Sequence, residues 1–271
     1  MGSLKIGVAL WSLGPTPDEA TLRKRLETAA EIGLKGVQPW CVDGGPNRPC
    51  VLDPDRCVGE QRRAMRTLVE SYGLTVSGFC AQLSGPSGLG GLRDREGLQA
   101  RVDKTKKALE LAADMGGPIV TTHPGAIPAD AADPMYQTLL ESIGEIGRHG
   151  EQVGAYFAIE TGQEPAEVLR GFLERLGLEH VKVNYDPANM LKHGTVRGVT
   201  VLGDWIVHTH AKDRHPETRK PTVGRGGVPW DEYVAALKSI GYDGWFAIED
   251  ESGAEDVVES IRAGKEFLEG Y

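Results

Sequence analysis

The sequence is short of cysteine. Its 271 residues include only four, at Cys41, Cys50, Cys57 and Cys80, and none of them forms the Cys-x-x-Cys pair with which thiolate zinc sites usually begin. We therefore predict four reduced, structural thiols. A disulfide or a metal-binding loop among the first three is the alternative.

Long apolar runs are also missing. No stretch approaches the roughly 18 to 20 consecutive apolar residues of a membrane-spanning helix. The segment 1–10 has one lysine and lacks the apolar core and small-residue cleavage site of a secretory signal. We therefore expect a cytoplasmic protein with no membrane partner.

Positive charge is outnumbered by negative charge, with 30 Lys and Arg against 39 Asp and Glu, a net charge of −9. The field of such a chain repels polyanions, so no nucleic-acid partner is expected. The 40% hydrophobic and 25% charged residues are typical of a folded globular protein rather than a disordered one.

What the sequence does contain is an alternation of short apolar runs and helical patterns. The first helical pattern follows Thr16-Pro17-Asp18-Glu19, where Thr16 and Glu19 have the spacing of a capping box, and ends at Gly33. Further helices are predicted over 60–72, 97–115, 136–152, 164–176, 192–201, 231–240 and 255–268. Strands are predicted to start near Ile6, Gly36, Thr75, Ile119, Tyr156, Val181, Ile206 and Trp245.

These eight strand starts lie 25 to 44 residues apart, which leaves room for a crossover helix and favours parallel pairing. Strands such as 156–159 and 245–248 are continuously apolar, as in a sheet buried on both faces. No G-x-G-x-x-G fingerprint of an open dinucleotide-binding sheet follows the first strand. The sequence therefore predicts an α/β fold, a (β/α)8 TIM barrel, as a single domain over residues 1–271.

Active sites of such barrels lie at the carboxyl ends of the strands, and four apolar runs close there on Glu160, Asp186, His210 and Glu249. A carboxylate placed after buried apolar residues is costly unless it is paired or binds a metal. Helix capping or ion pairing with loop arginines is the alternative for each residue alone. Together, three carboxylates and one imidazole predict a site for one divalent ion: Mn²⁺, Mg²⁺, Co²⁺ or Zn²⁺.

Other strand ends carry further polar or aromatic candidates. Strand alternation places His208, His210 and Lys212 on one face, and the deeper His208 is expected to be buried and structural. Gln38, Trp40, Gln82 and His123 stand after the second to fourth strands.

Several segments together resemble the xylose-isomerase-like TIM barrels of the sugar phosphate isomerase/epimerase group, and the resemblance extends from Ile6 to the last helix. They are Ile159-Glu160-Thr161, Tyr185-Asp186-Pro187-Ala188-Asn189, the stretch 208–213, Ile248-Glu249 and the late segment 223–230. The resemblance implies that Glu160, Asp186, His210 and Glu249 hold one divalent ion and that the two glutamates flank the reacting carbon.

The ketose 3-epimerase branch of that group also has a histidine three residues after the aspartate, a glutamate six after the first glutamate and an arginine six after the metal histidine. Here these places hold Asn189, Ala166 and Pro216, so that branch's reaction at C3 of a free ketose is not implied. Gln38 stands where many relatives have a glutamate.

The chemistry that this set of residues predicts is sugar isomerisation or epimerisation by proton transfer through an enediolate, which a bound cation stabilises. Glu160 and Glu249 are the predicted acid/base pair, and Asp186 and His210 are chiefly ligands. The predicted substrate is a small carbohydrate, free, phosphorylated or oxidised. Its predicted contacts are His123, Asn189, Lys212, Arg225 and Gln38, with Trp11 or Trp40 stacking on a sugar face.

Three other functions stay open at this point. A metal-dependent hydrolase or lyase acting on a sugar derivative would use the cation to activate water. An apurinic-site endonuclease, also found in the group, needs more metal ligands than are present and conflicts with the acidic charge. A noncatalytic sugar-binding barrel conflicts with the complete ligand set. Barrels of this group are often dimers or tetramers, so a homo-oligomer also stays open.

Overall fold

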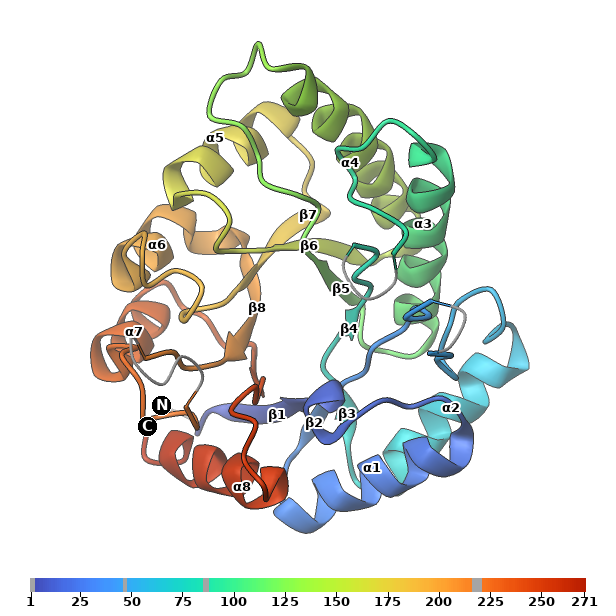
Figure 1. Cartoon of the computed structure of the whole chain (residues 1–271), viewed down its shortest axis with the longest axis vertical. Helices are drawn as coiled ribbons and strands as arrows, with labels where there is room; N and C mark the ends of the chain where they lie inside the picture. Colours follow the sequence, from blue (N-terminus) through green and yellow to red (C-terminus); the bar gives the residue numbers. More distant parts are fainter. Residues whose placement is uncertain (1–2, 46–47, 85–87, 216–220) are drawn as a thin grey trace.

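A computed structural model describes residues 3–45, 48–84, 88–215 and 221–271 (Figure 1). The described strands run parallel and form one sheet that curves into a barrel, with helices around its outside. The strands are β1 (Lys5–Ala9), β2 (Gly36–Gln38), β3 (Thr75–Val76), β4 (Phe79–Cys80), β5 (Ile119–Thr122), β6 (Tyr156–Glu160), β7 (Val181–Tyr185), β8 (Ile206–Ala211) and β9 (Trp245–Ile248).

The barrel closes at β3 and β4, two short strands that together take the place of the third strand of the barrel. The strand order is β3-β2-β1-β9-β8-β7-β6-β5-β4, so the sheet ends on β3 and β4, which only Ser77 and Gly78 separate in the chain. An isolated parallel bridge between Trp40 and Cys80 joins β4 to the chain just after β2. The eight predicted strands are thus confirmed, with the third divided in two.

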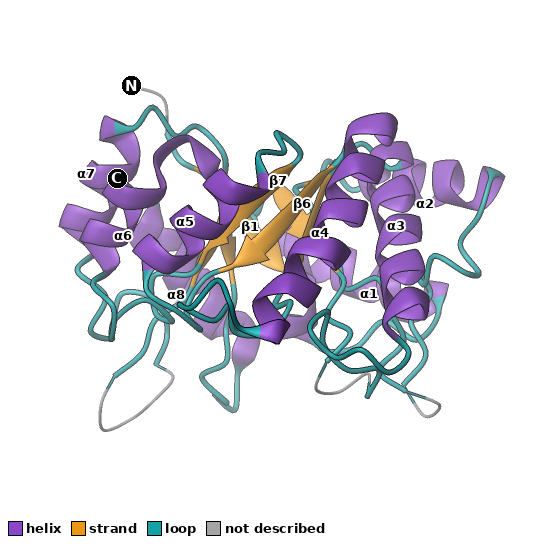
Figure 2. Ribbon diagram, turned by 90° about the horizontal axis from the view of Figure 1, so that it is seen from above, coloured by secondary structure: helices purple, strands orange, loops and turns teal. Residues whose placement is uncertain are grey.

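Helices alternate with the strands and pack around them, as the (β/α)8 prediction requires (Figure 2). Long loops gather on one side of the sheet. The α-helices are α1 (Glu19–Ile32), α2 (Glu60–Ser71), α3 (Leu98–Asp114), α4 (Pro134–Val153), α5 (Ala166–Leu176), α6 (Thr195–Leu202), α7 (Trp230–Ser239) and α8 (Val257–Leu268), with short 3-10 helices at Leu10–Leu13 (η1) and Gly203–Trp205 (η3).

The predicted capping box at the start of α1 is wrong. Asp18, not Thr16, is the N-cap residue, and its side chain accepts a hydrogen bond of 2.7 Å from Thr21 N. Asp is the better cap of the two, since a carboxylate also interacts favourably with the helix N-terminus. Thr16 is instead buried in the preceding loop, where its carbonyl accepts from Val51 N.

The four cysteines are buried and free, which confirms the predicted thiols. Burial raises the pKa of Cys41 and Cys80 well above the usual value. No helix within the described ranges is long and apolar enough to span a membrane. Of the residues considered in the sequence, Met1 and Pro216 lie outside the described ranges.

Candidate active site

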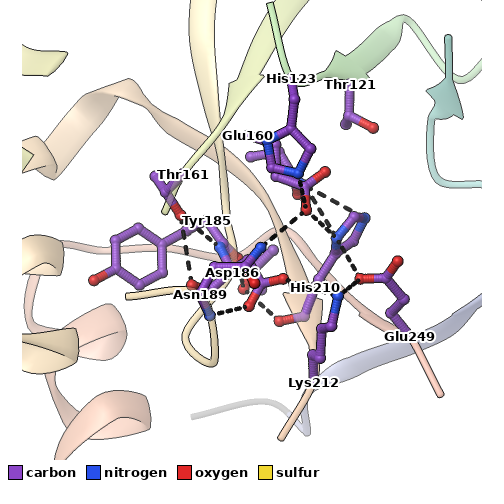
Figure 3. Close-up of polar contacts among 12 residues, drawn as sticks. Thr121, His123, Glu160, Thr161, Tyr185, Asp186, Asn189, His210, Lys212 and Glu249 are labelled. Carbon is purple, nitrogen blue, oxygen red and sulfur yellow. Dashed lines mark hydrogen bonds and ion pairs between the residues drawn. The ribbon is translucent and has the colours of Figure 1, made fainter. Parts of the chain in front are cut away.

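Four side chains from neighbouring strand ends converge at one end of the barrel (Figure 3). Glu160 ends β6, Asp186 follows β7, His210 lies in β8 and Glu249 follows β9. One nitrogen or oxygen atom from each lies within 4.8 Å of the others, and all four residues are buried. We call these four residues the metal-ligand cluster.

His210 lies between the two glutamates. Its Nδ1 is 3.4 Å from Glu160 Oε1 and 3.3 Å from Glu249 Oε2. Burial opposes the charge on His210, but the two carboxylates outweigh burial and raise its pKa to about 10. Burial also opposes ionisation of Glu249, yet His210 and Lys212 lower its pKa to about 2. The buried carboxylates of the cluster thus favour the charged form of His210.

Gln38 fixes the ring of His210. Its Oε1 accepts from His210 Nε2 at 2.9 Å, and its Nε2 donates to Thr121 Oγ1 at 3.0 Å. Because an amide oxygen can only accept, Nε2 carries a proton and Nδ1 faces the carboxylates. Gln38 is fully buried, so the structure places it behind His210 as an orienting group.

Asp186 has one satisfied and one orphaned oxygen. Its Oδ1 accepts from Asn189 N at 2.8 Å, whereas the buried Oδ2 has no hydrogen-bond partner among the described residues. Lys212 Nζ approaches Oδ2 only to 3.7 Å. Burial, together with Glu160 and Glu249, raises the pKa of Asp186 to about 6. A buried oxygen without a donor among the described residues, close to three further ligand atoms, fits a cation site.

Lys212 is the positive neighbour of the cluster. It is buried, and its Nζ lies 2.9 Å from both Glu249 Oε2 and Glu251 Oε2. Burial opposes its charge, but the surrounding carboxylates raise its pKa above the usual value. This lysine therefore stays charged beside the cluster.

Glu160 is approached from its other side by His123 and Asn189 (Figure 3). His123 Nε2 lies 3.2 Å and Asn189 Nδ2 3.4 Å from Glu160 Oε1. Gly162 makes this approach possible, because a Cβ at this positive-φ position would lie 2.2 Å from Asn189 Cβ. His123 is about a quarter exposed at its side chain and can meet a ligand as well as Glu160.

Asp213 organises the loop that follows β8, a role that the sequence analysis missed. Its carboxylate accepts from the backbone N–H groups of Gly224, Gly226 and Val228 at 3.0 to 3.1 Å and from Trp230 Nε1 at 2.9 Å. Any Cβ on Gly226 would collide with Asp213 Oδ1 at 1.9 Å. The sequence signal for this role of Asp213 was the glycine-rich segment 223–230, because the backbone N–H groups of such a loop need an acceptor.

Arg225, a predicted substrate contact, lies on this loop and is exposed. Among the described contacts, none joins its side chain to the metal-ligand cluster. His208 behaves as predicted: it is fully buried, bonds Asn184 Oδ1 through Nδ1 at 2.9 Å, and has a pKa lowered by burial to about 3.

An aromatic pair borders the cluster on the side of β1 and β2. Trp11 Nε1 donates to Glu249 Oε1 at 3.1 Å, and the indole packs edge-on against both His210 and Trp40, at centroid distances of 5.8 and 5.7 Å. Trp40 thus packs on Trp11, which in turn contacts the cluster. A tryptophan beside the sugar was predicted from the sequence, but nothing in the sequence pointed to the hydrogen bond from Trp11 to Glu249.

The comparison with family models decides the classification. The model of the xylose isomerase-like TIM barrel matches residues 26–270. The chain belongs to this family. Within it, this xylose isomerase-like barrel is 26% identical over 184 residues to an uncharacterized protein of Methanocaldococcus jannaschii and 27% identical over 127 residues to a D-psicose 3-epimerase of Ruminiclostridium cellulolyticum.

Those two alignments cover 62% and 42% of this chain and 62% and 41% of the relatives, so each is partial. A Streptomyces coelicolor protein named as a candidate hydroxypyruvate isomerase aligns over 90% of both chains at 23% identity. The relatives of this barrel therefore include sugar epimerases and isomerases.

Solved structures show the same fold. A xylose isomerase domain protein from Planctomyces limnophilus superposes with a TM-score of 0.76 at 24% identity and 90% coverage of both chains. The D-allulose 3-epimerase of Methylomonas sp. in complex with D-allulose gives 0.78 at 16% identity, covering 100% of this xylose isomerase-like barrel and 98% of the other chain. At these identities the likeness establishes the fold alone.

Proposed function

We propose that this protein is a divalent-metal-dependent sugar isomerase or epimerase that transfers protons through an enediolate. The observation that carries the proposal is the metal-ligand cluster, in which two buried glutamates from β6 and β9 face one another across an imidazole and an aspartate. Named relatives that act on sugars, the psicose and allulose 3-epimerases, support the substrate class.

Glu160, Asp186, His210 and Glu249 would hold the cation, through three carboxylates and His210 Nδ1. A hard or borderline divalent ion suits this donor set, and one structural neighbour, from Mycobacterium smegmatis, is a magnesium complex. When bound, the cation supplies a Lewis acid that polarises a carbonyl oxygen and stabilises negative charge. Gln38, which accepts from His210 Nε2, would keep Nδ1 free to bind the ion.

Glu160 and Glu249 are the proposed acid/base pair. Two strands separate them around the barrel mouth, so each can reach a different face of a sugar carbon. The carboxylate of Glu249 is positioned by Trp11 on one oxygen and Lys212 on the other, and that of Glu160 by His123 and Asn189. One glutamate removes the proton next to the carbonyl, and the other returns one to the opposite face or to the neighbouring carbon.

The remaining predicted residues take substrate roles in this proposal. His123, Asn189 and Lys212 lie at the cluster and would bind sugar oxygens, and Trp40 would line the approach beside Trp11. Arg225, exposed on the Asp213 loop, would reach a substrate only from the rim. We also propose that the whole chain, 1–271, is one domain.

The test is proton exchange between keto sugars and D₂O, followed by NMR, with protein that has been freed of metal and reloaded with Mn²⁺. We expect deuterium to enter next to the carbonyl only with the metal present. The product should keep the mass of the substrate apart from deuterium. A product that has lost water or a fragment would instead identify the lyase or hydrolase, and cleavage of an abasic duplex would identify the endonuclease.

A further inference from the structure

The barrel interior next to the metal-ligand cluster is polar, although the interiors of such barrels are mostly filled by apolar side chains. Asn184 in β7 and His208 in β8 precede the ligands Asp186 and His210 by two residues, so strand alternation puts them one step deeper on the same faces. Both are fully buried, and so, almost completely, is Ser77 between β3 and β4. Buried polar side chains are costly unless they are hydrogen-bonded, so their partners show what they hold in place.

These deeper side chains form a series of hydrogen bonds that ends on His210. Ser77 Oγ lies 3.4 Å from His208 Nε2, and His208 Nδ1 lies 2.9 Å from Asn184 Oδ1. Because an amide oxygen can only accept, Nδ1 of His208 carries the proton, and its Nε2 accepts from the Ser77 hydroxyl. With its oxygen held by His208, Asn184 presents its amide nitrogen to His210.

The amide nitrogen of Asn184 lies over the face of the His210 ring. Nδ2 is 3.3 Å from both Nδ1 and Nε2 of that ring. In the plane of the ring, a point equally far from both nitrogens at this distance would overlap the carbon between them, so Nδ2 must lie out of the plane. The χ2 torsion of histidine has broad minima, so contacts such as this one determine the orientation of the ring.

Two side-chain amides therefore hold His210 from different directions. Gln38 Oε1 binds the edge of the ring at Nε2, 2.9 Å away, and Asn184 lies on its face. Each amide has a further partner, Thr121 at 3.0 Å for Gln38 and His208 at 2.9 Å for Asn184. A single hydrogen bond at Nε2 lets the ring tilt, whereas contacts on both edge and face leave Nδ1 directed at the other ligands.

We propose that Asn184 and His208 are positioning residues for the metal ion, which fix the plane of His210 so that Nδ1 can bind a cation without reorganisation. The inference rests on the metal site of the proposed function. Loss of the partners that orient a metal-binding histidine typically costs roughly 10- to 100-fold in metal affinity. A pair with only a structural role would stabilise the barrel core and leave that affinity unchanged.

The experiment measures the Kd of Mn²⁺ for chelated protein by calorimetric titration, and the zero-field splitting of bound Mn²⁺ by electron paramagnetic resonance. Asn184→Leu keeps the branched shape of the side chain but removes the amide, and His208→Leu removes the donor that holds the amide. Each should raise the Kd by about 10- to 100-fold and broaden the distribution of zero-field splittings. His208→Asn, whose amide nitrogen takes the place of Nδ1, should restore most of the affinity.

Ser142→Ala is the matched control for the loss of a buried hydrogen bond. Ser142 is buried in α4, in the outer layer of helices, and its Oγ donates to Leu92 O at 2.9 Å. This variant should lower the melting temperature of the metal-free protein and leave the Kd of Mn²⁺ unchanged.

Ser77→Ala decides the question if the leucine variants fail to fold, because it removes only the hydroxyl at the far end of the series. It should raise the Kd by about twofold or more, the effect of one weak hydrogen bond. An unchanged Kd in this variant would then overturn the inference.

Two further results would overturn the inference and leave the proposed function standing, because the cation would still bind. One is a wild-type Kd in folded Asn184→Leu and His208→Leu. The other is an equal loss of affinity in Ser142→Ala, since the effect would then follow stability alone. A wild-type protein that binds no Mn²⁺ would reject the proposed function and this inference with it.

Discussion

The metal-ligand cluster and the cavity of about 640 Å³ that Trp11 and Trp40 line differ in origin. The cluster comes from the ends of strands β6 to β9, and hydrogen bonds or ion pairs hold its charged groups, except for one oxygen of Asp186. The cavity comes from the loops after β1 and β2 and is mainly apolar. In the proposed function, the strand ends would carry the chemistry and the loops would select the molecule on which it acts.

The largest expected effect comes from removing the acid/base pair. Glu160→Gln and Glu249→Gln should each lower the rate of solvent exchange by about 10²- to 10⁴-fold, because a positioned general acid or base contributes that much. The rate is measured by NMR in D₂O at saturating Mn²⁺. Exposed Glu151→Gln is the control. An unchanged exchange rate in either variant would remove that glutamate from the acid/base role.

Asp186→Asn separates metal binding from folding. In the absence of metal, this variant should melt at the wild-type temperature or above, because it removes a buried charge whose Oδ2 has no hydrogen-bond donor in the described structure. With Mn²⁺, wild-type protein should gain thermal stability, and the variant should gain much less at the same concentration. Thermal melts with and without Mn²⁺ check this. Equal stabilisation of both proteins would mean that Asp186 is no ligand.

Asp213→Ala should damage the structure beside the cluster rather than the chemistry itself. It leaves four backbone N–H groups and the Trp230 indole without their acceptor, for an expected loss of about 2–4 kcal/mol in the free energy of unfolding. Urea denaturation measures it. Asp204→Ala, at an exposed aspartate, is the control, and a loss as small as in this control would show that the loop does not depend on Asp213.

Glu164 contrasts with the paired carboxylates of the cluster. Burial raises its pKa to about 7, although its Oε2 accepts from Ile127 N at 3.1 Å. The folded protein therefore binds more protons than the unfolded chain between about pH 4.5 and pH 7, and Glu164 destabilises it increasingly as the pH rises through that range. Glu164→Gln should thus gain about 1–3 kcal/mol relative to wild type at pH 8 compared with pH 4.5.

Urea denaturation at the two pH values tests this, with Glu151→Gln as the exposed control. A stability difference between Glu164→Gln and wild type that does not change with pH would contradict the assignment. It would mean that Glu164 is charged in the folded protein without cost.

The strand ends were predictable because short apolar runs recur along the sequence and end on polar residues. Short apolar runs that close on Glu160 or Asp186 locate both a strand and its end, and barrel geometry then requires the ends to meet. The N-cap of α1 was harder to predict, because Thr16 and Asp18 are both good capping residues and only packing decides between them. The role of Asp213 and the cavity lined by Trp11 and Trp40 depend on the paths of loops, which have no periodic pattern in the sequence.

The proposed function depends most directly on one cation at the metal-ligand cluster. Protein purified without chelator should contain one divalent metal ion per chain by elemental analysis, and chelated protein should bind one Mn²⁺ per chain on titration. Asp186→Asn should lose most of that binding. No metal in the purified protein, together with no Mn²⁺ binding by the chelated wild type, would contradict the proposed metal-dependent function.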